Sequence, residues 1–251
     1  MTAHSDGVDT VAWLLQSDPA IRWQAMRDLT AASPEAIAAE RARVSHEGLG
    51  QKILARQESD GSWRRSDAPV WLSTLFSFLL LRATGVDRTE PAVEAAVTRL
   101  EALLGWDNQA GFWELRLVQP GVRPFFAGEI EPCINGGTLA LGGYFGRPTE
   151  SLARRLLDEQ LDDGGWNCDA ENGSVRSSFD TTINVLEGLL AYERASGGSA
   201  QIAAVRRRGE EYLLERKLLR RKSTGEVVNP AWQRFSFPVR SGRAMFSETR
   251  T

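Results

Sequence analysis

The residues of this chain best suited to chemistry are two cysteines and two carboxylates. Glu131 and Cys133 stand two residues apart, and Cys168 and Asp180 follow them. Thiolate sulfur and carboxylate oxygen are both competent zinc ligands, so the four side chains can form a metal site if the fold brings them together. Glu131 and Asp180 can also act as general acid or base if their surroundings hold their pKa near the working pH.

The same four residues also have a purely structural explanation. Cys133 can be a small buried side chain, and Glu131 and Asp180 can cap helices by accepting hydrogen bonds from free backbone N–H groups. The two histidines do not obviously complete a metal site, since His4 lies in the N-terminal tail and His46 precedes the repeats described below. The metal, acid–base and structural explanations all stay open at the level of the sequence.

A repeated motif indicates which elements must position these residues. A glutamine, a glycine four residues later and a tryptophan two further occur in residues 57–63 and again in residues 160–166. A weaker copy has Asn108 in place of glutamine, followed by Gly111 and Trp113. The three tryptophans are 50 and 53 residues apart (63 to 113 to 166). A recurrence at this period is typical of a repeat architecture.

The sequence predicts a helical hairpin after each copy of the motif. The first helix of each hairpin is apolar or small on several sides, which is typical of a buried helix; these helices span residues 71–83, 133–145 and 178–195. The second helix has one apolar face, which is typical of a surface helix; these span residues 91–104, 149–161 and 200–214. No segment has convincing strand periodicity. We therefore expect an all-α fold of repeated hairpins, in a ring or a solenoid.

The Gln-x-x-x-Gly-x-Trp recurrence resembles the repeat of the terpenoid cyclase and protein prenyltransferase superfamily, which includes squalene-hopene cyclases. The resemblance covers residues 48–232, and residues 131–133 and 178–183 also look like those of bacterial squalene cyclase-like proteins. It implies an α/α toroid in which the glutamine caps an outer helix and stacks near the tryptophan. The residue types allow this, because glycine permits a positive φ after a helix and an indole buries a large surface.

The resemblance also bears on chemistry. Class II cyclases of the superfamily protonate their substrate through a D-x-D-D motif, and class I synthases bind magnesium diphosphate through D-D-x-x-D; this sequence contains neither. Protein prenyltransferases hold zinc with an aspartate, a cysteine two residues later and a downstream histidine. This chain offers Glu131 in place of the aspartate and Cys133 two residues later, whereas Asp180 stands where squalene cyclase-like proteins usually have histidine. The resemblance thus implies zinc as the candidate cofactor, with Cys168 and Asp180 as further ligands.

The chain divides into three parts on this plan. Residues 1–47 form a helical entry segment, because Ser17-Asp18-Pro19 and Ser33-Pro34-Glu35 each supply a cap followed by proline. Residues 48–238 carry the hairpins, and residues 239–251 form an irregular tail. The superfamily closes its ring with more hairpins than are visible here, so we expect a toroid that is incomplete at its C-terminus. Exposed apolar faces of terminal helices would favour a homo-oligomer.

Aromatic residues on or beside the predicted buried helices indicate a ligand class. They can line an apolar cavity for an isoprenoid chain, or they can be plain core. They are Trp71, Phe76, Phe78, Phe125, Phe126, Tyr144, Phe145 and Phe179.

Charged residues near the end of the repeats also have two explanations. The arginines and lysines within residues 206–222 form either a diphosphate cradle or a salt-bridged outer helix, because they alternate with glutamates. Asp162 and Asp163 lie in the motif loop, where we expect a solvated or capping role.

The composition bounds the remaining function classes. A net charge of −3 gives no argument for nucleic acid binding, and no apolar run approaches the ~20 residues of a membrane-spanning helix, which leaves only peripheral membrane contact. Two cysteines without a secretory signal fit free thiols in the cytoplasm, and a disulfide between Cys133 and Cys168 is the less favoured alternative. We expect a squalene cyclase-like or prenyltransferase-like protein for a hydrophobic isoprenoid. The alternatives are a non-catalytic binding protein on the same scaffold and an inactive truncated homologue.

Overall fold

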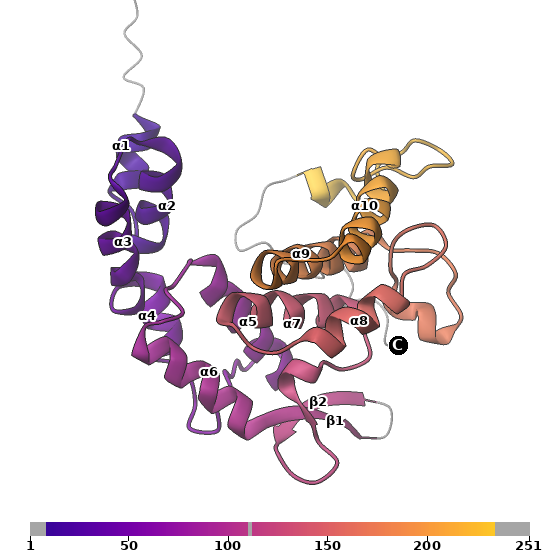
Figure 1. The fold of residues 1–251 in the computed structure, drawn as a ribbon, viewed down its shortest axis with the longest axis horizontal. Coiled ribbons are helices and arrows are strands. Elements are labelled where there is room, and N and C mark those ends of the chain that lie inside the picture. The colour runs from indigo at the N-terminus through magenta and orange to yellow at the C-terminus, as the bar shows by residue number, and fades with distance from the viewer. Residues whose placement is uncertain (1–8, 110–111, 234–251) are drawn as a thin grey trace, which may run out of the picture. The chain divides into compact units, whose positions relative to one another are not determined.

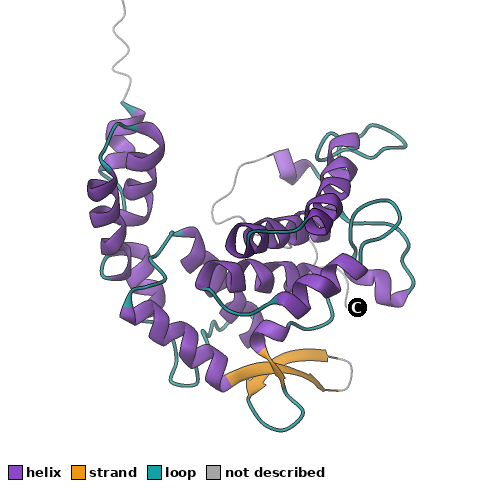
Figure 2. Cartoon of the chain, in the orientation of Figure 1, coloured by secondary structure: helices purple, strands orange, loops and turns teal. Residues whose placement is uncertain are grey.

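The computed structural model describes residues 9–109 and 112–233, and most of them are helical (Figures 1 and 2). The chain forms two compact units, one ending at Leu104 and the other beginning at Gly105. The boundary falls inside the region of repeats, residues 48–238. No helix in the described ranges is both long and apolar enough to cross a membrane.

In the described part of the first unit, the regular elements before Leu104 are helices. Its helices are α1 (Thr10–Leu15), α2 (Pro19–Leu29), α3 (Pro34–Ala42), α4 (Gly48–Leu54), α5 (Val70–Ala83) and α6 (Pro91–Leu103), with a 3-10 turn, η1 (Arg43–Ser45), before α4. The two predicted caps are confirmed, because the side chains of Asp18 and Ser33 accept hydrogen bonds from the first turns of α2 and α3. Buried Trp23 joins α2 to the end of α5, since its indole donates to the carbonyl of Thr84 at 2.9 Å.

The second unit combines helices with a small sheet. Its helices are α7 (Pro132–Phe145), α8 (Glu150–Asp158), α9 (Phe179–Ser196) and α10 (Ala200–Glu215), with 3-10 turns η2 (Phe125–Ala127), η3 (Cys168–Asn172) and η4 (Pro230–Gln233). The six hairpin helices are therefore confirmed to within a few residues at their ends. α8 also has the predicted one-sided burial, with Leu152 and Leu156 inside and Arg154 exposed.

The sheet corrects the expectation of an all-α fold. Strands β1 (Leu104–Gln109), β2 (Phe112–Leu117) and β3 (Arg123–Pro124) lie in the order β2-β1-β3, and β1 pairs antiparallel with β3. The alternation that forms β2 is short: Leu115 is buried between exposed Glu114 and Arg116. Trp106 fixes β1, because its buried indole donates to the carbonyl of Phe125 at 2.9 Å.

The weak third copy of the motif falls on this sheet and does not behave as a repeat. Trp113 lies in β2, and the guanidinium carbon of Arg123 is 4.9 Å from the centroid of its ring. The buried Nε1 of Trp113 has no hydrogen-bond partner among the described residues. Asn108 lies in β1, and Gly111 is outside the described residues. This copy therefore lies on paired strands, whereas the predicted hairpin, α7 and α8, follows it.

The two good copies of the motif make the same contacts. Gln57 donates through Nε2 to the carbonyls of Gly61, at 3.1 Å, and Ala96, at 2.9 Å. Gln160 does the same to Gly164, at 2.7 Å, and to Val205, at 2.8 Å. In each copy one amide therefore joins the end of a helix, its own loop and the second helix of the following hairpin.

The tryptophans complete this arrangement. The indoles of Trp63 and Trp166 are buried and donate to the carbonyls of Ile53 and Leu156, both at 2.7 Å. Their backbone N–H groups donate to buried threonine hydroxyls at 3.1 Å, on Thr74 and Thr182 respectively. The internal repeat is thus a repeat of contacts as well as of sequence.

Glycines bring α7 and α9 into close contact, side by side in Figure 1. A Cβ at Gly136 would lie 2.5 Å from the carbonyl oxygen of Asn184, and a Cβ at Gly188 would lie 2.4 Å from that of Gly136. Real side chains do not tolerate such distances, so only glycine permits this approach. The first turns of α7 and α9 contain two of the predicted site residues, Cys133 and Asp180, and both helices belong to the second unit.

Candidate metal centre

Three of the four predicted ligands meet beside the start of α7. The sulfur of Cys133 lies 2.8 Å from that of Cys168 and 3.7 Å from Oε2 of Glu131. One ligand atom from each of the three residues lies within 4.8 Å of the other two. Cys133 occupies the first turn of α7, whereas Cys168 begins η3 in the loop before α9. Residues 35 positions apart are therefore brought together by the contact between α7 and α9.

Asp180 is not a member of this cluster. It lies in the first turn of α9 and is half-buried, and burial raises the pKa of its carboxyl. The neighbouring residue Thr181 points to the site instead, with Oγ1 3.4 Å from the sulfur of Cys168. One residue along an α-helix is a rotation of about 100°, which explains why Asp180 and Thr181 cannot both face the sulfurs.

The helix-capping explanation does not account for the two carboxylates. Glu131 occupies the N-cap position of α7, but its side chain makes no capping hydrogen bond. At α9 the cap is Ser178, whose hydroxyl accepts a hydrogen bond from the N–H of Thr181 at 3.1 Å. The other structural expectation fits better, since Cys133 is buried, with 7% of its surface exposed.

The segment that presents Glu131 is held firmly in place. The N–H of Glu129 donates to Oδ1 of Asn135, and Nδ2 of Asn135 donates back to the carbonyl of Glu129, at 2.9 and 3.2 Å. Arg155 of α8 donates to the carbonyls of Glu129 and Ile130. These hydrogen bonds join the backbone before α7 to the first turn of that helix. They therefore restrict the position from which Glu131 extends its side chain.

Glu129 is a functional candidate that the sequence analysis did not find. Its carboxyl is buried with 1% of the residue exposed, and Oε1 accepts the N–H of Glu131 at 2.6 Å. Oε2 has no hydrogen-bond partner among the described residues. Burial raises the pKa of this carboxyl to about 8. The only signal in the sequence is that Glu129 stands between Gly128 and Ile130, at the end of an otherwise uncharged stretch that begins at Pro124.

The surroundings keep the thiol of Cys133 protonated. Its hydrogen bond to Cys168 and its burial raise its pKa well above the usual range, and the negative charges of Glu131 and Glu129 act in the same direction. A bound cation would reverse this effect, because a positive charge beside the sulfur stabilises the thiolate. Metal binding at this site would therefore require deprotonation of the thiol, and would favour it.

The donor set fits zinc better than magnesium or calcium. Two sulfurs and one carboxylate oxygen form a soft-to-borderline set, whereas Mg²⁺ and Ca²⁺ require oxygen ligands. Two sulfurs on one tetrahedral zinc lie about 3.8 Å apart, given Zn–S bonds of about 2.3 Å. The sulfurs would have to separate by about 1 Å from 2.8 Å to hold the ion. Among the described residues, His46 does not belong to the cluster, since it pairs with Glu90 in the first unit; His4 lies outside the described residues.

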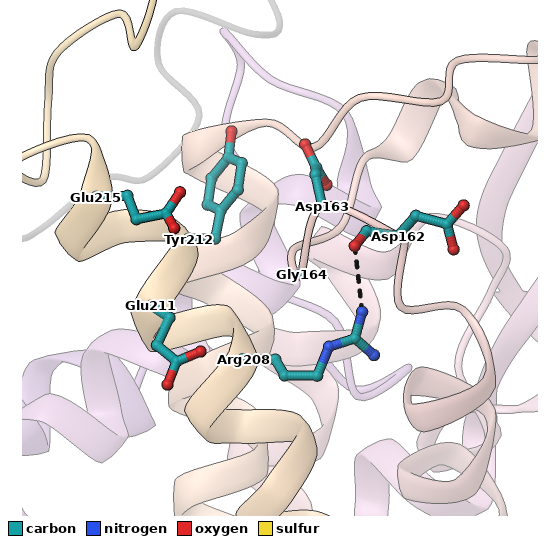
Figure 3. A pocket seen from close by; sticks show the side chains of 7 residues that line it. All are labelled: Asp162, Asp163, Gly164, Arg208, Glu211, Tyr212 and Glu215. Atoms are coloured by element: carbon teal, nitrogen blue, oxygen red, sulfur yellow. Dashed lines mark hydrogen bonds between the residues drawn. The ribbon is translucent and has the colours of Figure 1, made fainter.

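A polar surface pocket lies at the second motif loop (Figure 3). It encloses about 170 Å³ between that loop and α10, and six of its seven lining residues are charged or carry a hydroxyl: Asp162, Asp163, Gly164, Arg208, Glu211, Tyr212 and Glu215. Arg208 donates to the backbone carbonyl of Asp162 at 3.3 Å. Asp163 accepts hydrogen bonds from Ser177. The expected structural role of the aspartate pair is confirmed for Asp163, and the pocket is too polar for an isoprenoid.

Only part of the late basic set lies on the predicted helix, because Arg206 to Arg208 belong to α10, which ends at Glu215, and the others follow it. Arg206 pairs with Glu193 and Glu210, and Lys222 pairs with Glu215. The guanidinium of Arg216 lies 3.7 Å from the ring centroid of Tyr212. These contacts favour the structural explanation over a diphosphate cradle.

The aromatic residues divide into core and partly exposed groups. Four are buried, namely Phe78, Phe125, Phe126 and Phe145. Trp71, Phe76, Tyr144 and Phe179 are partly exposed. In the second unit the ring of Phe179 lies between those of Tyr212 and Trp232, with centroids 5.7 and 5.4 Å away.

Comparison with known proteins identifies no relative. No protein-family model matches the chain, and no curated protein matches it significantly.

Proposed function

We propose that this protein is a zinc-binding, prenyltransferase-like protein that binds or processes a hydrophobic isoprenoid substrate on an α/α-hairpin scaffold of the toroid type. The observation that carries the proposal is the convergence of Glu131, Cys133 and Cys168 beside the start of α7. The contacts shared by the two motif copies support the scaffold. Free thiols are required, so the proposal includes a reducing compartment such as the cytoplasm.

Each site residue has a defined part in this proposal. Cys133, Cys168 and Glu131 hold the ion, and the hydrogen bonds of Glu129 and Asn135 orient Glu131. Bound zinc would supply a Lewis acid that could hold and polarise an oxygen of the substrate. Asp180 is the candidate proton donor, because burial raises the pKa of its carboxyl and favours the protonated form. The aromatic faces of Phe179 and Trp232 suit an isoprenoid chain.

Metal content measured by inductively coupled plasma mass spectrometry tests the proposal. We expect about one zinc per chain, and a loss of more than about half of it in Cys133→Ser and in Cys168→Ser. Glu171→Gln is the matched control, since Glu171 is an exposed carboxylate in the same turn as Cys168. Asp180→Asn should also retain zinc. A content below about 0.2 zinc per chain after refolding with zinc would contradict the metal function.

The substrate class requires its own measurement. The zinc-loaded chain is titrated in a calorimeter with farnesyl diphosphate and, separately, with farnesol. We expect saturable binding of farnesyl diphosphate and weaker binding of farnesol. Absence of heat with both ligands would contradict an isoprenoid substrate while leaving the metal site intact.

A non-catalytic binding protein on the same scaffold is the second candidate. The burial of Phe125, Phe126 and Phe145 favours it, because side chains packed in the core cannot line a cavity. Binding of a partner protein, or self-association seen by light scattering, together with failure of both isoprenoid titrations, would favour this function.

A further inference from the structure

The two cysteines of this chain are its only cysteines, and their sulfurs are in direct contact. Both are free thiols. A disulfide bond is about 2.05 Å long, so the sulfurs at 2.8 Å need to approach by about 0.8 Å to form one. That movement is comparable in size to the separation that zinc requires. A movement of 1 Å or less, in one direction or the other, would therefore allow the two sulfurs either to form a disulfide or to bind a zinc ion.

We propose that Cys133 and Cys168 form a reversible intrachain disulfide, and that this oxidation and metal binding exclude each other. The disulfide is inferred from the contact between the two sulfurs. Its mutual exclusion with metal binding rests on the proposed metal function. A sulfur engaged in a disulfide is no longer a thiolate ligand, so oxidation removes two of the three donors at once.

The reaction balances with a peroxide as oxidant. The partly exposed thiol of Cys168 attacks hydrogen peroxide, which yields a sulfenic acid at Cys168 and one molecule of water. The buried thiol of Cys133 then attacks the sulfenic sulfur; the S–S bond forms, the S–O bond breaks, and a second water leaves with the thiol proton. Each sulfur loses one electron, and the two electrons reduce the peroxide. A small dithiol reverses the reaction by exchange.

The elements that carry the two sulfurs allow the approach. Cys133 is fixed in the first turn of α7, whose glycines pack against α9. Cys168 lies in the short turn η3, and the loop around it is anchored on both sides of the turn. Nδ2 of Asn167 donates to the carbonyl of Arg176 at 2.7 Å, and the N–H of Ser178 donates to the carbonyl of Trp166 at 2.8 Å. The approach of less than 1 Å is therefore expected to fall on the turn between these anchors and not on either helix.

Intact-mass spectrometry of the full chain tests the proposal. The protein is reduced, stripped of metal with a chelator, and treated with an equimolar amount of hydrogen peroxide. We expect a mass loss of about 2 Da, a fall in titratable thiols under denaturing conditions from two to zero, and recovery of both on treatment with dithiothreitol. In Cys133→Ser, which lacks the resolving thiol, dimedone should label Cys168. Cys168→Ser should retain its buried thiol.

The outcomes separate this proposal from the metal function. Mass loss in a chain that binds no zinc supports the disulfide and contradicts the metal site. Zinc binding by a chain whose thiols both survive peroxide overturns the disulfide and leaves the metal site standing. A disulfide-linked dimer on a non-reducing gel, or further oxidation of Cys168 with Cys133 still a thiol, also overturns it. If the chain both forms the disulfide and binds zinc, loading it with zinc should slow the mass loss. The oxidised chain should then bind less than about a tenth of the zinc that the reduced chain binds.

Discussion

The buried carboxyl of Glu129 makes the stability of the second unit depend on pH. Its pKa is about 8 in the fold, because burial disfavours the charged form, against about 4.5 in the unfolded chain. Between these values the folded state holds a proton that the unfolded state has released. The free energy of unfolding therefore falls as pH rises from about 4.5 to about 8, by roughly 2–5 kcal/mol from this group.

Glu129→Gln should remove this dependence. Glutamine keeps an oxygen that can accept the N–H of Glu131, and it stays neutral at every pH in the window. Urea unfolding at pH 5 and pH 8 measures the effect: the variant should change much less than the natural chain over this range. Glu150→Gln, at an exposed carboxyl in α8, serves as control and should keep the natural slope. Equal slopes for the natural chain and Glu129→Gln would show that Glu129 is ionised in the fold.

Residue types and the resemblance to prenyltransferases selected three residues that the structure brings together, Glu131, Cys133 and Cys168. They did not give the exact membership of the candidate site. Asp180 was selected on the same grounds, yet the phase of α9 turns Thr181 to the sulfurs. Glu129 was missed because a glutamate in a sequence carries no mark of burial. That property comes from Asn135 and the surrounding fold.

At the scale of elements, the motif glutamine acts as a bridge between three segments. The Nε2 group of Gln160 satisfies the carbonyl of Gly164 in its loop and that of Val205 in α10. Replacing Gln160 by alanine would remove both hydrogen bonds. The two partly buried carbonyl groups would then lack this donor. An unsatisfied buried polar group costs about 1–3 kcal/mol.

Gln160→Ala should therefore destabilise the chain by about 1–3 kcal/mol, and Gln57→Ala by a similar amount because its contacts are the same. Gln201→Ala is the matched control, since Gln201 is exposed on α10, and a change within about 0.5 kcal/mol is expected there. Chemical denaturation gives the comparison. If the motif variants were as stable as the control, the motif would not act as a bridge.

The helices were predictable from sequence because their signals are long and repeated. Periodic apolar residues over more than ten positions, with caps such as Ser33 and Asp18, located α5 to α10 and the entry helices. The sheet was not predictable, because β2 shows only a brief alternation around Leu115, and β1 depends on the distant contact between Trp106 and Phe125. A short strand is defined by its partners, which the local sequence does not contain.

At the scale of the whole molecule, the chain is divided into two units with separate cores. Trp63 and Phe78 belong to the first core, and Trp166 packs with Leu156 and Val185 in the second. All members of the candidate metal cluster lie in the second unit. A ligand that binds only the folded state stabilises the part of the chain that must be folded to bind it. Zinc should therefore act on one unit and not on the other.

Hydrogen-exchange mass spectrometry with and without zinc tests this localisation. Zinc at about 100 times its Kd should protect α7, η3 and the first turns of α9 by up to about 2.7 kcal/mol, which is about a hundredfold slower exchange. Peptides from α1 to α4 should exchange at unchanged rates, and Cys133→Ser should show no protection by zinc anywhere. The Glu171→Gln variant should keep the full effect. Protection in both units would mean that they unfold as one, whereas protection away from α7 would place the metal elsewhere in the chain.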